Sequence, residues 1–126
     1  HCSVHVLGWS PNAPNPHGYT TDRSIHGRYE TDYVEREITE GEVEAAARAM
    51  HPVHELSGDW LAESTTYIAA CNSYVETIYR WDLKTPFGSG REPAEAKPFT
   101  VNRLAEGSVM LRNIWVTAWR RSAQTP

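Results

Sequence analysis

The sequence predicts an α+β fold, in which one short helix accompanies an antiparallel β-sheet. Two observations lead to this fold class. An amphipathic helical pattern lies at residues 39–52, and the segments that follow it are rich in β-branched and aromatic residues and are joined by short turn-like connections. With 126 residues, the chain is expected to form a single domain over residues 1–126.

The first 38 residues carry weaker patterns. "CSVHVLGW" at 2–9 alternates enough to predict a short strand, and the proline-rich stretch 10–18 is typical of a loop. Residues 19–38 are polar and fit several interpretations: a strand in their second half, a lid or partner-contacting segment, or disorder.

Residues 39–52 carry the clearest helical signal. Thr39 and Glu42 have the spacing of a capping box, in which a hydroxyl and a carboxylate satisfy N–H groups that lack helical partners. The apolar residues recur at i, i+3, i+4 and i+7 and form one stripe: Val43, Ala46, Ala47 and Met50. Pro52 cannot continue the helix and predicts its end.

The rest of the chain is predicted to be strands and turns. The expected strands are 59–71, 73–83, 99–104 and 108–119. A Gly/Pro-rich connection occupies 85–98, and "AEG" at 105–107 is the expected turn of a closing hairpin.

Charge and composition exclude several classes of protein. The net charge is −4 and the pI about 5.8, so a nucleic-acid partner is not expected. No apolar run is long enough for a membrane span or a secretory signal. Two cysteines are too few for a disulfide framework; Cys2 and Cys71 are expected as free thiols, with Cys71 in the core, and the protein is expected in the cytoplasm.

The second half resembles a known superfamily. "RWD" at the end of one segment, the "TPFG" linker and "FTVNRLAEGSVMLRNIWVTAW" are similar to the last strands of NTF2-like proteins, over residues 53–120. SnoaL-like polyketide cyclases, ketosteroid isomerases and limonene-type epoxide hydrolases belong to that superfamily. The resemblance implies a cystatin-like α+β cone, a curved antiparallel sheet wrapped around a pocket, and a homodimer formed through the sheet. Those proteins open with helices that cap the pocket, so the N-terminal helix is missing or atypical here.

The resemblance also implies a set of catalytic residues. Side chains two apart in a strand share a face, so Arg80 and Asp82 would lie side by side. In the epoxide hydrolases an Arg-x-Asp pairs with a second aspartate, whose place is held here by Asn113. Because an amide cannot act as a general base, Asp82 would transfer the proton, Arg80 would orient it and Asn113 would polarise the substrate. Glu76 would share this face as a substrate contact or second acid; alternatively, Glu76, Arg80 and Asp82 form an ion-pair ladder on a solvated face.

Other polar and aromatic residues complete the candidate site. His54 is a candidate general base, since histidine titrates near neutral pH. Tyr33, Trp60 and Trp115 are candidate substrate contacts, although aromatic residues in strands more often serve packing. No metal site and no cofactor are expected, because Pro52 opposes a helical pairing of His51 with His54. The remaining metal hypothesis is a copper or zinc protein that uses His1, His5 or the His51–His54 pair.

Two functions follow from these expectations. The first is a cofactor-independent enzyme that acts on a hydrophobic small molecule of polyketide, terpenoid or steroid type, by acid–base isomerisation, cyclisation or epoxide opening. The second is a non-catalytic ligand-binding or dimerisation module.

Overall fold

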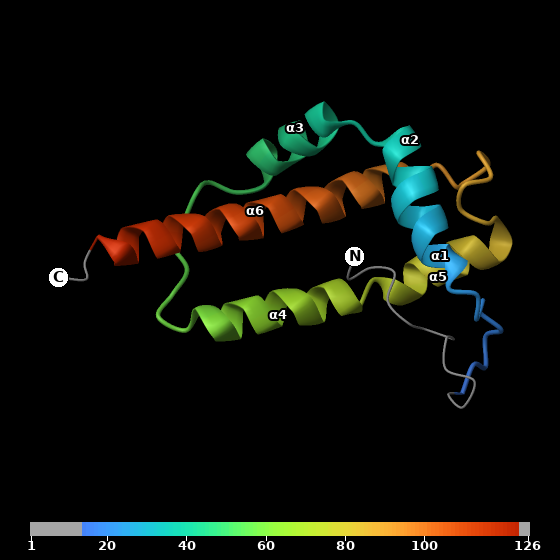
Figure 1. Cartoon of the computed structure of the whole chain (residues 1–126), viewed down its shortest axis with the longest axis horizontal. Coiled ribbons are helices and arrows are strands. Elements are labelled where there is room, and N and C mark those ends of the chain that lie inside the picture. The colour runs from blue at the N-terminus through green and yellow to red at the C-terminus, as the bar shows by residue number, and fades with distance from the viewer. Residues whose placement is uncertain (1–13, 124–126) are drawn as a thin grey trace.

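The computed structural model describes residues 14–123, and every regular element in that part of the chain is a helix (Figure 1). The predicted α+β fold is therefore wrong. Segments 59–71 and 73–83 form helices, and segments 99–104 and 108–119 belong to one continuous helix. The NTF2-like resemblance is therefore wrong as well, because that fold requires a curved β-sheet. Residues 14–123 also offer no sheet for the predicted homodimer, and the strand predicted at 2–9 lies outside the described residues.

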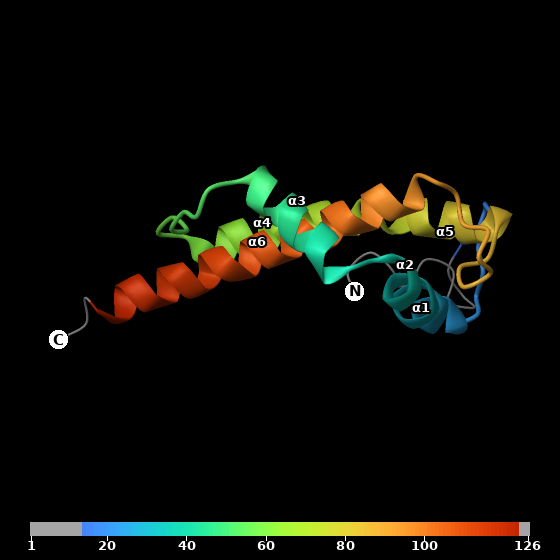
Figure 2. The ribbon, with the colours of Figure 1, turned by 90° about the horizontal axis from the view of Figure 1, so that it is seen from above.

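One long helix organises the molecule. The elements are α1 (Ser24–Gly27), the π-helix η2 (Arg28–Val34), α2 (Glu35–Glu37), α3 (Glu40–Met50), α4 (Trp60–Asn72), α5 (Val75–Lys84) and α6 (Ala96–Ser122). Helix α6 is flanked by α3 and α4, while α1, η2, α2 and α5 gather around its N-terminal end (Figure 1). The view from above shows the same elongated arrangement (Figure 2).

Helix α3 confirms the sequence prediction. The Thr39 hydroxyl accepts a hydrogen bond from the Glu42 N–H at 3.3 Å, and the Glu42 carboxylate accepts one from the Thr39 N–H at 3.0 Å, so the capping box is present. The predicted apolar stripe is half-buried, and α3 packs against α6. Lys97 on α6 adds an ion pair to Glu42, with Nζ 2.9 Å from Oε1.

Glu42 links the capping box to α6, and this predicts a pH-dependent contribution to stability. The Lys97 ammonium and the Thr39 hydroxyl and N–H lower the pKa of Glu42 from 4.5 to about 2. A depressed carboxyl pKa stabilises the fold above the ordinary value, and this stabilisation is lost as the pH falls from about 4.5 through about 2. Glu42→Gln should therefore melt below the parent at pH 7 and at the same temperature near pH 2.

The control for Glu42→Gln is Glu40→Gln, which removes one charge from the same helical turn. Thermal unfolding is followed by circular dichroism across the pH range. If both variants lose the same stability with the same pH dependence, the loss reflects charge near the helix N-terminus and not the contacts of Glu42.

The hydrophobic core lies at the N-terminal end of α6. Its buried members come from α1, η2, α5 and the segments beside them: Tyr19, Ile25, Tyr29, Tyr33, Val75, Ile78, Tyr79, Phe87 and Ala96. Helix α5 turns one face into this cluster because Val75, Ile78 and Tyr79 recur at helical spacing. Phe87 fills the centre, with its ring centroid 4.8 Å from that of Tyr29 and 5.1 Å from that of Tyr33.

Candidate functional site

The irregular segment 51–59 is fastened to α6 by side chains of the helix. Thr117 accepts a hydrogen bond from the Leu56 N–H at 2.8 Å and donates to the Asn113 carbonyl at 2.7 Å. Arg121 donates to the Ser57 carbonyl at 2.7 Å. The bonds to the Leu56 N–H and the Ser57 carbonyl satisfy backbone groups that have no helical partner, so they hold the segment in place between α3 and α4.

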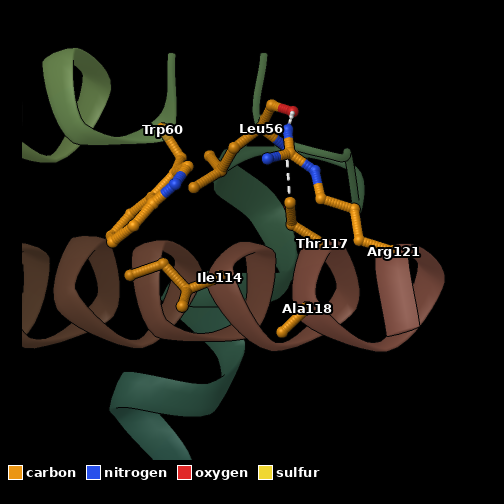
Figure 3. A pocket seen from close by; sticks show the side chains of 6 residues that line it. All are labelled: Leu56, Trp60, Ile114, Thr117, Ala118 and Arg121. Atoms are coloured by element: carbon orange, nitrogen blue, oxygen red, sulfur yellow. Dashed lines mark hydrogen bonds between the residues drawn. The ribbon is translucent and has the colours of Figure 1, made fainter. Parts of the chain in front are cut away.

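Two hollows lie between α4 and α6, on either side of Leu56. The smaller one, of about 200 Å³, is lined by Leu56, Trp60, Ile114, Thr117, Ala118 and Arg121 (Figure 3). The Trp60 indole and the Ile114 side chain form apolar walls on opposite sides, and the Arg121 guanidinium closes the polar end (Figure 3). Trp60 is 51% exposed, so much of its ring is still open to solvent.

The larger hollow, of about 500 Å³, is the α4–α6 groove. Its apolar lining comes from Leu56, Ala62, Ala70, Val109 and Met110. Its polar lining comes from His51, His54, Ser57, Asp59, Glu63, Thr66, Tyr67, Glu106 and Asn113. The volume falls within the range of small-molecule sites, which often lie between helices and combine apolar walls with a few polar groups.

His54 and Asn113 meet at one edge of the groove. Asn113 is 2% exposed, and its Oδ1 accepts hydrogen bonds from the His54 N–H and from Arg112, each at 3.4 Å. The amide nitrogen then faces His54 Nδ1 at 3.1 Å and donates to it. The neutral imidazole therefore carries its proton on Nε2, so the ring can donate a hydrogen bond through that atom.

The acidic residues at the start of α4 have structural partners. Asp59 caps the helix by accepting a hydrogen bond from the Ala62 N–H at 2.9 Å. Glu63 accepts one from the Ser57 N–H at 2.5 Å. Hydrogen bonds from the Ser57 side chain and backbone lower the pKa of Glu63, so this carboxylate is ionised at neutral pH.

The proposed Arg80–Asp82 couple is not formed. Residues two apart in a helix point to nearly opposite sides, so Asp82 is buried at 5% exposure while Arg80 lies on the surface and donates to Thr77 at 3.2 Å. The partner of Asp82 is Arg28, whose Nη2 donates to both carboxylate oxygens at 3.0 and 2.8 Å. The Phe87 N–H also donates to Asp82 at 3.0 Å. This arrangement excludes the ion-pair ladder as well.

The other predicted contacts are scattered over the molecule. Glu76 is exposed on α5 and accepts a hydrogen bond from the Tyr19 hydroxyl at 2.8 Å. Tyr33 is 2% exposed within the core, and burial raises its pKa to about 12. Trp115 is 66% exposed on α6 and lines neither hollow. Of the eight predicted residues, the structure places His54 and Asn113 together, with Trp60 nearby.

Several residues that line the two hollows escaped the sequence analysis. Val109 and Thr117 are buried at a spacing of four from the predicted residue Asn113 along α6, which is a helical signal that the strand assignment concealed. Tyr67 crosses from α4 to α6, where its hydroxyl lies 3.2 Å from the position that a Cβ on Gly107 would take. The strand and turn patterns in the sequence gave no indication of this contact between α4 and α6.

Two negative findings concern residues 14–123. This part of the chain has no group of three or more His, Cys, Asp or Glu side chains arranged to hold a metal ion. None of its helices is long and apolar enough to cross a membrane. His1 and His5, the candidate copper ligands, lie outside the described residues.

Comparison of the chain with protein-family models, with curated proteins and with solved structures gave no match. The function is therefore argued from the geometry of the α4–α6 groove.

Proposed function

We propose that the chain is a non-catalytic binding module that takes an apolar small molecule into the α4–α6 groove. The observation that carries this proposal is the groove itself: about 500 Å³ of space with apolar surface from both helices and polar side chains around it. The smaller hollow beyond Leu56 offers an indole surface on which a planar part of the ligand would pack.

The polar edge of the groove favours a ligand that carries an oxygen acceptor. Asn113 fixes the His54 ring through Nδ1, and Nε2–H is then the donor that an alcohol, ether or carbonyl oxygen of the ligand would meet. A donor fixed in this way would orient such a ligand at the polar edge of the groove.

The groove supports binding better than it supports catalysis. The enzyme hypothesis requires Asp82 and Asn113 in one pocket, but Asp82 lines neither hollow and is held by Arg28 near the core. The amide of Asn113 has no basic group. Cytoplasmic localisation is part of the same proposal and rests on the cysteine content alone.

Filling the groove should abolish binding of an apolar probe. Ala70 on α4 lines the groove, so Ala70→Phe would occupy its space. N-phenyl-1-naphthylamine, an uncharged fluorescent probe, should bind Ala70→Phe at least about tenfold more weakly than it binds the parent chain, as expected for a loss near 1.4 kcal/mol. Titration by fluorescence measures the change.

Two further variants make this test specific. Ala69→Phe is the matched control, since Ala69 is an exposed neighbour that does not line the groove; its affinity should stay within about twofold of the parent value. Trp115→Ser tests the alternative site on the outer face of α6. The proposal is wrong if the probe binds Ala70→Phe as tightly as the parent, or if only Trp115→Ser weakens it.

A further inference from the structure

Helix α6 carries an uncharged stripe on the side that α3, α4 and segment 51–59 leave open. We call this face the outer stripe; it consists of Leu104, Ser108, Leu111, Trp115, Trp119 and Ser122. These residues follow one another at steps of three and four, which places them on one face of the helix. The last turns of α6 also extend past the ends of α3 and α4 (Figure 1, Figure 2).

The apolar area of the outer stripe matches the largest apolar patch of a typical monomeric protein. Trp115 is 66% exposed and Trp119 is 78% exposed, which leaves on the order of 300 Å² of indole surface in water. Leu104 at 38% and Leu111 at 48% bring the total to roughly 400 Å². Contiguous apolar patches of this size are often functional.

The arginines beside the outer stripe are directed away from it. Arg112 donates to the carbonyls of His51 and Pro52 at 3.1 and 3.2 Å. Arg120 reaches Glu55 at 3.4 Å, and Arg121 reaches Ser57. The stripe therefore presents no charge, which opposes nucleic acid or an acidic peptide as its occupant and permits two identical faces to meet without repulsion.

The order of residues along the stripe is self-complementary. An antiparallel two-fold axis between Leu111 and Arg112 places Leu104 opposite Trp119 of a second copy and Ser108 opposite Trp115 of that copy. Each indole then faces a smaller residue, and Leu111 meets its own counterpart at the axis. Alternation of large and small side chains across facing positions is what allows two helices to interdigitate.

We propose that the chain forms a two-fold symmetric dimer, in which the outer stripe of α6 packs against the outer stripe of a second copy of the chain. A standard interface buries about 800 Å² per partner, of which roughly 450 Å² or more is apolar. The roughly 400 Å² of the outer stripe supplies most of that apolar area. The dimer leaves the α4–α6 groove open, because the groove residues of α6 do not belong to the outer stripe.

Mass measurement tests the dimer. Size-exclusion chromatography with light scattering on the full chain should give twice the 14.2 kDa chain mass, falling toward the monomer on dilution. Leu111→Glu brings two carboxylates together at the axis and should shift the chain to monomer at the same concentrations. Leu83→Glu, which introduces the same charge at a 55% exposed position of α5, should leave the dimer intact.

Cross-linking tests the register. In a chain that carries Cys2→Ser, oxidised Leu111→Cys should form a disulfide-linked dimer, since the axis brings the two positions together. Leu104→Cys should not, because the matching position on the second copy is 119, about 22 Å farther along the helix. A monomer at all concentrations, a dimer unaffected by Leu111→Glu, or equal cross-linking at both positions would each overturn the proposal.

Discussion

Replacing Asp82 by alanine is expected to lower the free energy of unfolding by about 3 kcal/mol, because it removes the buried carboxylate that binds Arg28 and leaves this guanidinium only the exposed Asp22, 3.6 Å away. The lower end of the range for buried pairs applies, since the Arg28 side chain is 24% exposed and water can partly replace the lost contact. The Phe87 N–H loses its acceptor at the same time. Urea unfolding followed by circular dichroism measures the loss.

Arg80→Gln is the matched control, since the sequence pairs this arginine with Asp82 and the structure does not. Arg80 lies on the surface of α5, so its substitution should change stability by less than about 0.5 kcal/mol. Equal losses for both variants would show that Arg80, and not Arg28, holds the carboxylate.

Phe87→Ala is expected to cost about 3–4 kcal/mol. Its ring is 1% exposed and packs against the rings of both Tyr29 and Tyr33, so truncation leaves a cavity that these aromatic side chains cannot easily fill. The same residue anchors the 85–95 connection on the core. The denaturation midpoint in urea should fall while the slope stays unchanged.

Leu83→Ala provides the comparison for Phe87→Ala, because it truncates a large apolar side chain that is 55% exposed on α5. Its cost should be less than about 1 kcal/mol. A loss as large as that of Phe87→Ala would mean that the outer face of α5 is covered in solution and that the core described here is incomplete.

Local chemistry made α3 predictable. A capping box, one apolar stripe and a terminating proline all act within about one helix length, so no distant part of the chain is needed to identify the element. The burial of Cys71 was also predicted correctly, from residue type alone.

Helix α5 shows how two periodicities compete in one segment. Val75, Thr77, Tyr79 and Trp81 alternate and suggest a strand, and their β-branched and aromatic side chains strengthen that impression. The buried face follows helical spacing instead: Val75, Ile78, Tyr79 and Asp82. The helical pattern was harder to recognise because its fourth member is a carboxylate, whose burial depends on Arg28, 54 residues away.

The sequence predicted two strands where α6 forms one helix, because the buried face of α6 contains polar residues. Thr100, Asn113 and Thr117 occupy core positions, and each has a buried or partly buried hydrogen-bond partner from another segment: Tyr29, His54 and Leu56. Gly107 was taken for a turn, whereas it continues the helix beneath the Tyr67 hydroxyl. Such partners are set by tertiary structure, so the sequence pattern alone does not reveal them.

Helix α4 has a consequence for how any groove ligand would act on the chain. Of its thirteen residues only Cys71 is buried, so little apolar surface holds this helix in place compared with α5 or α6. A molecule seated between α4 and α6 would supply the buried contacts that α4 lacks. Binding and the ordering of α4 would then be one coupled equilibrium. The entropy lost when α4 is ordered would reduce the observed affinity for the ligand, and binding would lower the conformational entropy of the chain.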